Sequence, residues 1–305
     1  MSPSYRALYA SGELQRRAEI LNTYYTSCVL CPHQCGVDRT NGGRGICNQG
    51  SLPVVASHNL HNGEEPPISG ESGSGTIFFS GCTGTCIFCQ NYPISQLGTG
   101  NIVSVARLAK IMIELQGRGC HNINFVTPTH FLPSIVSALV LAAEQGLKIP
   151  LVYNTSGYER LEILRFLDGI IDVYLPDAKY ADNTIAAEIS GFQDYTKYNK
   201  AALIEMWRQI GELVTVDGIA QKGMIVRHLI LPDDLSGTKN VLTFLAGVLS
   251  TDIHVSLMNQ YFPAYKSTNH KTLNRRITGD EYKIAIEIFD ALGLHNGWIQ
   301  EHNFV

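Results

Sequence analysis

The sequence has no run of about 18 apolar residues, the length that a helix needs to cross a membrane. Its N-terminus, MSPSYRALYASGELQRR, lacks the apolar core of a secretion signal. An excess of charge is also missing, because the formal net charge is −4 and the pI is near 6.2. Nucleic-acid-binding and membrane-surface proteins usually carry a basic patch. We therefore expect a cytoplasmic protein with no nucleic-acid and no membrane partner.

The sequence also lacks low-complexity tracts. Its hydrophobic content of 45% and charged content of 16% are those of an ordinary globular core. The 305 residues suffice for one large domain with a small appendage. The stretch NGEEPPISGESGSG (62–75) is rich in Gly, Pro and Ser and is typical of a connector. We predict an N-terminal helix, four-cysteine module and connector over residues 1–70, and a larger domain over residues 71–305.

Eight cysteines are present, and in a reducing cytoplasm clustered cysteines act as metal ligands or catalytic thiols rather than as disulfides. The isolated Cys120 precedes a predicted strand and is expected to be a small buried apolar residue. The other seven form two groups: Cys28, Cys31, Cys35 and Cys47, and then Cys82, Cys86 and Cys89.

From about residue 75 onward, apolar strand-like runs alternate with amphipathic stretches that have apolar residues three or four positions apart. Successive β/α units of this kind predict an α/β fold with a parallel sheet, either doubly wound or curved into a partial barrel. The predicted strands are Thr76–Ser80, Ile123–Thr127, Pro150–Thr155, Ile171–Asp177, Met224–Leu231 and His254–Phe262. The predicted helices are Val103–Gln116, Leu132–Gln145, Glu159–Leu167, Tyr195–Ile210, Thr238–Leu249 and Gly279–Leu292.

Polar residues follow several of these predicted strands. In parallel α/β folds, functional side chains gather at the carboxyl ends of strands. We therefore predict a site at that edge of the sheet, formed by Thr127, Thr129, Asn154, Ser156, Asp177, Lys179, Arg227, Asn259 and Gln260.

The stretch GCTGTCIFCQN (81–91) places three cysteines in a CxxxCxxC loop directly after the first strand. One interpretation is a zinc site completed from elsewhere in the chain. The other is a [4Fe–4S] cluster, in which three thiolates leave one of the four irons without a protein ligand. A cluster that only carries electrons is normally closed by a fourth cysteine, so an open position indicates that a substrate or cofactor binds there.

This loop, with an aromatic residue before its last cysteine, resembles the signature of the radical SAM superfamily. The resemblance implies that Cys82, Cys86 and Cys89 hold a [4Fe–4S] cluster and that S-adenosylmethionine (SAM) binds the open iron. It also implies a partial (β/α)6 barrel and reductive cleavage of SAM to a 5′-deoxyadenosyl radical that abstracts hydrogen. Further segments, among them NINFVTPTH, PLVYNTSGY, YLPDAKY and MNQYFPAYK, resemble PflX-type proteins related to pyruvate formate-lyase activating enzyme.

The same resemblance implies SAM-binding roles for residues at the strand ends. A Gly-Gly-Glu motif of the activating enzymes is replaced here by VTPTH, so Thr127 and Thr129 would have to meet the methionyl amine. An arginine suits a carboxylate because its guanidinium donates two parallel hydrogen bonds. The remaining positions that match the family pattern are Asn154, Ser156, Asp177, Lys179 and Arg227.

Each of these residues also has a structural interpretation. Asn154 and Ser156 could close a turn, Thr129 could cap a helix, and Asp177 with Lys179 could be a solvated ion pair. For His130 and His228, which lie beside strand ends, we expect hydrogen-bonded structural roles rather than acid–base chemistry.

The segment CVLCPHQCGVDRTNGGRGIC (28–47) has two, three and eleven residues between its successive cysteines. Four thiols this close predict a second, closed metal site at Cys28, Cys31, Cys35 and Cys47. Zinc and an iron–sulfur cluster both fit four thiolates, and the spacing does not decide between them.

We expect an oxygen-sensitive radical SAM oxidoreductase of anaerobic metabolism that abstracts hydrogen from a protein or peptide, as the activase of a glycyl radical enzyme does. The alternatives are radical modification of a small metabolite and a non-catalytic iron–sulfur electron-transfer protein. The expected partners are an electron donor such as flavodoxin or ferredoxin and a protein substrate. The C-terminal run with Tyr261, Phe262 and Tyr265 is a candidate border of the substrate opening, and its aromatic residues could instead pack the last strand.

Overall fold

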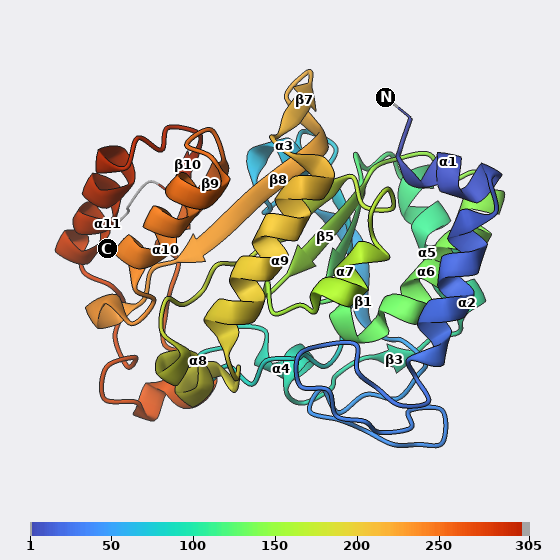
Figure 1. Ribbon diagram of the computed structural model, residues 1–305, viewed down its shortest axis with the longest axis horizontal. Coiled ribbons are helices and arrows are strands. Elements are labelled where there is room, and N and C mark those ends of the chain that lie inside the picture. Colours follow the sequence, from blue (N-terminus) through green and yellow to red (C-terminus); the bar gives the residue numbers. More distant parts are fainter. Residues whose placement is uncertain (1, 301–305) are drawn as a thin grey trace.

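The computed structural model describes residues 2–300 and shows a central sheet covered by helices (Figure 1). Seven parallel strands follow one another in the order β10-β9-β8-β6-β5-β4-β2, and β1 and β3 continue the sheet in antiparallel fashion. The strands are β1 (Val54–His61), β2 (Ser74–Phe79), β3 (Asn101–Ile102), β4 (Ile123–Val126), β5 (Leu151–Thr155), β6 (Val173–Pro176), β7 (Val214–Val216), β8 (Ile219–Leu229), β9 (His254–Met258) and β10 (Gly297–Ile299).

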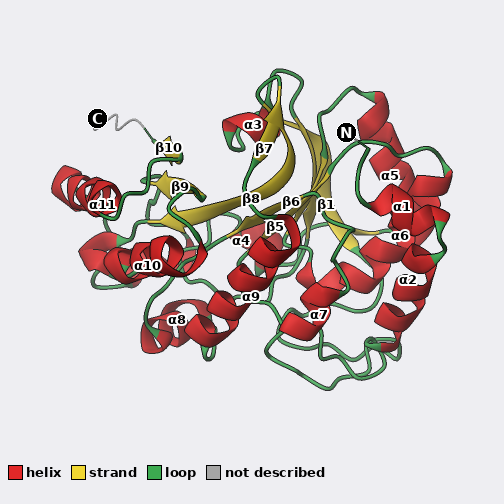
Figure 2. Cartoon of the chain, turned by 45° about the horizontal axis from the view of Figure 1, so that its top comes forward, coloured by secondary structure: helices red, strands yellow, loops and turns green. Residues whose placement is uncertain are grey.

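Helices α1 and α2 precede the first strand and the others lie between later strands; Figure 2 shows several helices along one face of the sheet. The α-helices are α1 (Tyr5–Ala10), α2 (Glu13–Thr23), α3 (Pro66–Ser69), α4 (Tyr92–Ser95), α5 (Val105–Gly117), α6 (Leu132–Glu144), α7 (Leu161–Arg165), α8 (Asn183–Ser190), α9 (Tyr195–Ile210), α10 (Thr238–Phe244) and α11 (Gly279–Ala291). Short 3-10 segments are η1 (Thr129–Phe131), η2 (Pro232–Asp234) and η4 (Tyr265–Asn269), and η3 (Leu245–Leu249) is a π-helix.

The predicted α/β fold with a parallel sheet is confirmed, and all six predicted strands and all six predicted helices occur in the predicted order. Two helices differ from the prediction. The stretch 159–167 is helical only over α7, and the stretch 238–249 divides into α10 and η3. Four strands were not predicted: β1, β3, β7 and β10. The last three have only two or three residues each, too short a pattern to recognise.

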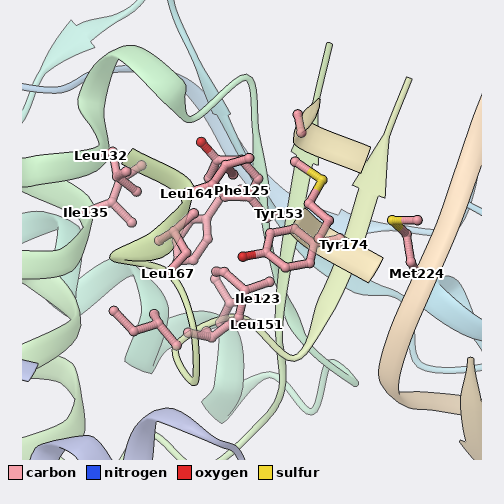
Figure 3. Packing of buried hydrophobic residues seen from close by; sticks show 14 of the residues in the cluster. Ile123, Phe125, Leu132, Ile135, Leu151, Tyr153, Leu164, Leu167, Tyr174 and Met224 are labelled. Atoms are coloured by element: carbon pink, nitrogen blue, oxygen red, sulfur yellow. The ribbon is translucent and has the colours of Figure 1, made fainter. Parts of the chain in front are cut away.

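Alternating side chains of the parallel strands point to opposite faces, because a strand has a two-residue period. On the face toward the helices, Phe125, Tyr153 and Tyr174 join the main apolar core (Figure 3). On the other face, which we call the inner face, Val152, Val173, Leu175 and Ile225 pack with Ile68 of α3. Asn154 and Arg227 lie two residues beyond Val152 and Ile225 on their strands, so they share this inner face.

The N-terminal segment is attached to the same sheet. Helix α2 packs against α6, and β1 pairs with β2 along six residue pairs. Between α2 and β1, residues 28–53 form no helix or strand and carry the four N-terminal cysteines. The predicted connector contains α3, whose Ile68 covers part of the inner face. No comparison tests the predicted division at residue 70, which stays a prediction.

Candidate functional site

The three-cysteine loop lies at the carboxyl end of β2, and each of its sulfur atoms has a hydrogen-bonding partner. The Gly84 amide donates to Sγ of Cys82 at 3.3 Å, and the Ser190 hydroxyl donates to Sγ of Cys86 at 2.9 Å. Sγ of Cys89 lies 3.1 Å from the Ser95 hydroxyl. Burial raises the pKa of the Cys82 thiol to about 12 and also raises the pKa of Cys86, so binding of a metal would be needed to ionise them. The neighbouring hydrogen-bond donors would then stabilise the thiolates.

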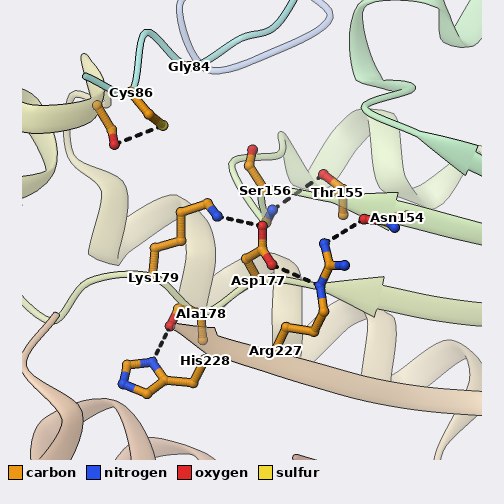
Figure 4. A network of polar contacts seen from close by, with 12 residues as sticks. Gly84, Cys86, Asn154, Thr155, Ser156, Asp177, Ala178, Lys179, Arg227 and His228 are labelled. Carbon is orange, nitrogen blue, oxygen red and sulfur yellow. Dashed lines mark hydrogen bonds and ion pairs between the residues drawn. The ribbon is translucent and has the colours of Figure 1, made fainter. Parts of the chain in front are cut away.

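Beside this loop, charged side chains of the inner face form one connected row (Figure 4). Lys179 Nζ lies 2.7 Å from Oδ2 of Asp177, and Arg227 Nε donates to Oδ1 of the same carboxylate at 3.0 Å. The other end of Arg227 donates from Nη2 to Oδ1 of Asn154 at 2.6 Å. Four of the residues predicted from the strand ends are therefore in direct contact, although 73 residues separate Asn154 from Arg227 in the sequence.

Burial acts to raise the pKa of Asp177, but the positive charges of Arg227 and Lys179 outweigh it and hold the pKa below its usual value. Burial likewise acts to lower the pKa of Lys179, and Asp177 and Cys86 more than offset it, so that this pKa is raised. Both groups therefore stay ionised at neutral pH. The solvated ion pair considered from the sequence is not what the structure shows, because Asp177 is 6% exposed.

Residues that sequence reasoning missed hold Asp177 in place. The Asn199 amide and the Tyr195 hydroxyl both donate to the main-chain carbonyl of Asp177, at 2.9 and 3.2 Å. Gly157 has a φ of +70°, and a Cβ atom there would lie 2.3 Å from that carbonyl oxygen. Only glycine fits such a close approach with a left-handed backbone. Asn199 and Tyr195 belong to α9, where their helical spacing gives no sign of this role.

The three predicted hydroxyl residues have different surroundings. Ser156 lies next to the charged row in Figure 4, and its carbonyl, 3.0 Å from the Tyr195 hydroxyl, shares that hydroxyl's hydrogen with the Asp177 carbonyl. Thr127 has a φ of +57°, which is rare and strained for a β-branched residue, and its amide donates to the Asn154 carbonyl at 2.9 Å. Thr129 is not part of the row: its hydroxyl donates to Oε1 of Glu159 at 2.7 Å.

Glu159 is the centre of a separate buried group that the sequence did not indicate. It is 1% exposed and accepts hydrogen bonds from Thr129 and Thr155, with the Tyr153 hydroxyl at 3.5 Å. Burial raises the pKa of Glu159 to about 7, against the opposing effect of these hydroxyl groups. The carboxyl is therefore partly protonated near neutral pH.

The two histidines beside the strand ends are structural, as predicted. His130 is buried, its Nε2 donates to the Ser80 carbonyl at 2.8 Å, and burial lowers its pKa to about 3. His228 is fully buried, with Nδ1 2.6 Å from the Ala178 carbonyl and Nε2 3.0 Å from the Thr238 hydroxyl. Cys120 is 4% exposed, which confirms the prediction of a buried residue.

Two cavities of about 220 Å³ each meet at the charged row. The first lies against the cysteine loop and is lined by Cys86, Phe88, Cys89, Asp177 and Lys179, among others. The second extends away from that loop and is lined by Glu64, Glu65, Pro66, Ser256, Trp298 and Gln300, among others. Arg227, Met258 and Gln260 line both cavities. The two glutamates were missed because they lie in the stretch interpreted as a connector.

The N-terminal cysteine segment packs beside the three-cysteine loop. Nε2 of His33 donates to the carbonyl of Thr83, inside that loop, at 2.7 Å. The thiols of Cys28, Cys35 and Cys47 all lie close enough to Cys31 to act electrostatically on it. Within residues 2–300, however, no group of three or more His, Cys, Asp or Glu side chains is arranged to hold a single metal ion. A cluster of several irons spaces its ligands farther apart than one ion does.

Arg39, which the sequence analysis did not single out, joins this segment to the sheet. It is 2% exposed, it donates to the carbonyls of His130 at 2.5 Å and Gln49 at 3.2 Å, and its Nη1 lies 3.8 Å from Sγ of Cys28. Its guanidinium also lies over the Tyr25 ring at 4.7 Å. Among the described residues no carboxylate pairs with this buried cation.

A sequence model of the radical SAM superfamily matches residues 76–221, the stretch that contains the cysteine loop, Asp177 and Lys179. The matched stretch, just under half of the chain, is a radical SAM domain. Such a domain implies radical chemistry with SAM and a [4Fe–4S] cluster, and the residues present fit both groups. The hydrogen-bonded thiols of Cys82, Cys86 and Cys89 would be the cluster ligands. The adjoining cavity is lined by the charged side chains of Asp177, Lys179 and Arg227.

A curated relative, the uncharacterized protein MJ0674 of Methanocaldococcus jannaschii, is 31% identical over 291 residues, which cover 92% of this chain and 79% of the relative. Two solved structures have a lower sequence identity to this chain. TYW1 with a bound lysine-pyruvate adduct is 12% identical with a TM-score of 0.43, over 71% of this chain and 73% of that one. HydG, a maturase of the [FeFe]-hydrogenase, is 13% identical with a TM-score of 0.48. That match covers 71% of this chain and 49% of the HydG chain. Both scores are too low to support a functional inference.

No α-helix within residues 2–300 has the length and apolarity to span a bilayer. The predicted cytoplasmic location stays a prediction, as do the individual SAM-binding roles and the partners.

Proposed function

We propose that this radical SAM protein abstracts hydrogen from a protein or peptide substrate, in the manner of the activases of glycyl radical enzymes. The observation that carries the radical chemistry is the position of the three-cysteine loop directly beside the fixed row Lys179–Asp177–Arg227–Asn154. When bound to the cluster and reduced, SAM supplies a 5′-deoxyadenosyl radical. A ferredoxin or flavodoxin is the proposed electron donor.

In this proposal, residues of the chain bind the cluster and SAM and orient them. Cys82, Cys86 and Cys89 hold the cluster. Arg227 and Lys179 offer positive charge to the methionyl carboxylate, and Asp177, fixed between them, offers an acceptor to the amine. Because each side chain is already held by a neighbour, little rearrangement is needed on binding, which favours orientation of the reacting groups. Phe88, Leu229 and Met258 supply apolar walls that exclude water from the cavity.

Support for a peptide substrate comes from the surface beside the cysteine loop. The sheet ends in open edges at β10 and β3 rather than closing on itself. The rings of Tyr92 and Tyr265 are stacked 4.9 Å apart, and Phe262 is 38% exposed with the Arg276 guanidinium 5.6 Å above it. Exposed aromatic and arginine side chains are common in protein interfaces. Tyr261 does not belong to this surface, because it is fully buried and packs edge-on to Phe88.

A small metabolite is the second candidate substrate. It is favoured by the size of the second cavity, since about 220 Å³ accommodates a group of side-chain size.

The radical chemistry is tested by anaerobic reconstitution with iron and sulfide, followed by reduction and addition of SAM. We expect formation of 5′-deoxyadenosine by the wild type, its loss in each of Cys82→Ala, Cys86→Ala and Cys89→Ala, and its retention in the control Cys120→Ala. Full activity of the triple alanine variant would refute the assignment.

The substrate is tested separately with the active enzyme. A doublet EPR signal on a partner protein supports the activase proposal. Deuterium transfer from a labelled small molecule to 5′-deoxyadenosine, with partner proteins remaining free of radical, replaces it with the metabolite proposal.

A further inference from the structure

One carboxylate of the second cavity has an oxygen that receives no hydrogen bond from residues 2–300. Glu65 is 8% exposed, lines this cavity, and has its Oε2 atom buried without a hydrogen-bond partner among the described residues. Leaving a carboxyl oxygen buried without a partner costs free energy, and a hydrogen-bond donor from outside the chain would remove that cost.

Arg227 acts electrostatically on Glu65 as well as on Glu64, but within residues 2–300 no ion pair or hydrogen bond joins its guanidinium to Glu65. Arg227 Nη1 lies 3.8 Å from Oε2 of Glu64, and its Nε is already bonded to Asp177. Lys179 is also paired with Asp177. Nδ1 of His61 lies 3.6 Å from Oε1 of Glu64, beyond hydrogen-bonding distance. Three carboxylates, those of Asp177, Glu64 and Glu65, therefore lie around the two cavities with two cations, Lys179 and Arg227. Both cations are paired with Asp177.

The walls of the cavity suit a cation. Trp298 also lines it, and an indole ring is the aromatic group that attracts cations most strongly. Gln260 and Gln300 add amide oxygens, and Met258 adds an apolar surface. The volume of about 220 Å³ corresponds to roughly seven water molecules at about 30 Å³ each, enough for an extended amine and far too little for a folded segment.

We propose that the substrate carries a protonated amine or a guanidinium, which enters the second cavity and donates hydrogen bonds to Glu65 and Glu64. The proposal rests on the proposed function, since it names the chemical class of the substrate for the same site. Because Arg227 and Gln260 line both cavities, a group anchored at Glu65 extends past them toward the cysteine loop, which places its hydrogen-bearing carbons on the side of the radical chemistry.

The cation has two possible sources, a basic side chain of a peptide and a free amine. The probes for the first are N-acetyl-lysine amide and its ε-acetylated form, which lacks the charge. The probes for the second are 1,5-diaminopentane and 1,5-pentanediol. Binding to the SAM-loaded, reconstituted protein is measured anaerobically by calorimetry. We expect one charged probe to bind and its uncharged counterpart to bind at least about tenfold more weakly, the size of a charge-assisted hydrogen bond.

Glu65→Gln keeps the shape of the side chain and removes its charge. We expect the affinity for the charged probe to fall about tenfold or more, and Glu65→Asp to retain the preference for the charged probe. Glu71→Gln is the matched control, because Glu71 lies on the same segment and is exposed. If neither charged probe is preferred, or if Glu65→Gln weakens SAM binding as much as probe binding, the proposal is wrong; in the latter case the glutamates serve the cofactor.

Formation of 5′-deoxyadenosine and binding of the charged probe are measured separately, so the radical function and the amine site can fail independently. If the wild type forms no 5′-deoxyadenosine but binds a charged probe through Glu65, the radical function fails and the binding site stands. If it forms 5′-deoxyadenosine and prefers no charged probe, the radical function stands and this inference fails.

Discussion

Arg227 and Asp177 form a buried ion pair across neighbouring parallel strands, with Nε of the arginine 3.0 Å from Oδ1 of the aspartate. The same carboxylate binds Lys179 through its other oxygen, and the same guanidinium binds Asn154. Each partner therefore fixes the next, and the geometry of the inner face depends on all four residues.

We predict that Arg227→Lys lowers the rate of 5′-deoxyadenosine formation about tenfold or more, because an ammonium lacks the planar fork that donates to Asp177 and Asn154 from two separate nitrogen atoms. Arg227→Met should also reduce the free energy of unfolding by about 1–3 kcal/mol, since Oδ1 of Asp177 loses its hydrogen-bond donor while Lys179 still pairs with Oδ2. Product formation and urea unfolding measure the two effects. Arg165→Lys, at an exposed position, is the control. Wild-type rates in Arg227→Lys would contradict the proposed role of the row.

The pair also predicts acid sensitivity. The pKa of Asp177 is lowered in the folded state, so the pair stabilises the protein above the ordinary pKa of 3.8 and this contribution is lost as the pH falls through the lowered value. Unfolding free energies measured from pH 6 to pH 3 should fall less steeply in Arg227→Met than in the wild type. Equal slopes would show that the ion pair has no part in acid unfolding.

Because the pKa of Glu159 is raised, we expect it to make the free energy of unfolding depend on pH with the opposite sign to Asp177. The pKa of Glu159 is raised from 4.5 to about 7, so the stabilisation is complete below pH 4.5 and is lost as the pH rises to about 7. The free energy of unfolding that depends on this group amounts to about 3 kcal/mol over this window. Glu159→Gln cannot ionise and should become more stable relative to the wild type at pH 8 than at pH 5. Glu144→Gln, at an exposed position, should show no such change. A pH-independent difference for Glu159→Gln would contradict the raised pKa.

Arg39 predicts how the N-terminal segment is held. Arg39→Lys should lose the hydrogen bonds to the carbonyls of His130 and Gln49 and lower the free energy of unfolding by about 3 kcal/mol. Amide hydrogen exchange should accelerate in residues 28–52 more than in β5. Arg44→Lys is the matched control, because Arg44 is exposed and belongs to the same loop. Unchanged exchange in Arg39→Lys would mean that other contacts hold the segment.

The second metal site stays a prediction, and Arg39 favours an anionic centre there because its buried charge has no carboxylate partner among the described residues. We expect the variant without Cys82, Cys86 and Cys89 to retain metal, either about one zinc or iron with sulfide, because four thiolates close a site of their own. Metal and sulfide analysis of the folded variant measures this. Loss of all metal would show that the two cysteine groups are not independent.

The sequence by itself determined the six predicted parallel strands, the helices between them and the three-cysteine loop. These are local properties: a two- or 3.6-residue period marks an element, and three cysteines within eight residues lie near one another without help from the rest of the chain. The carboxyl ends of parallel strands also meet at one edge, which is why Asn154, Asp177, Lys179 and Arg227 were predicted together and are in contact.

Tertiary structure alone decided what each side chain meets. Thr129 follows a strand as Thr127 does, yet it turns to Glu159, because the backbone after β4 enters the 3-10 segment η1. Glu65 lies in a stretch that looks like a connector, and only the packing of α3 against the inner face brings it to a cavity. Side-chain direction and burial depend on contacts between distant segments, and no local pattern of residues encodes them.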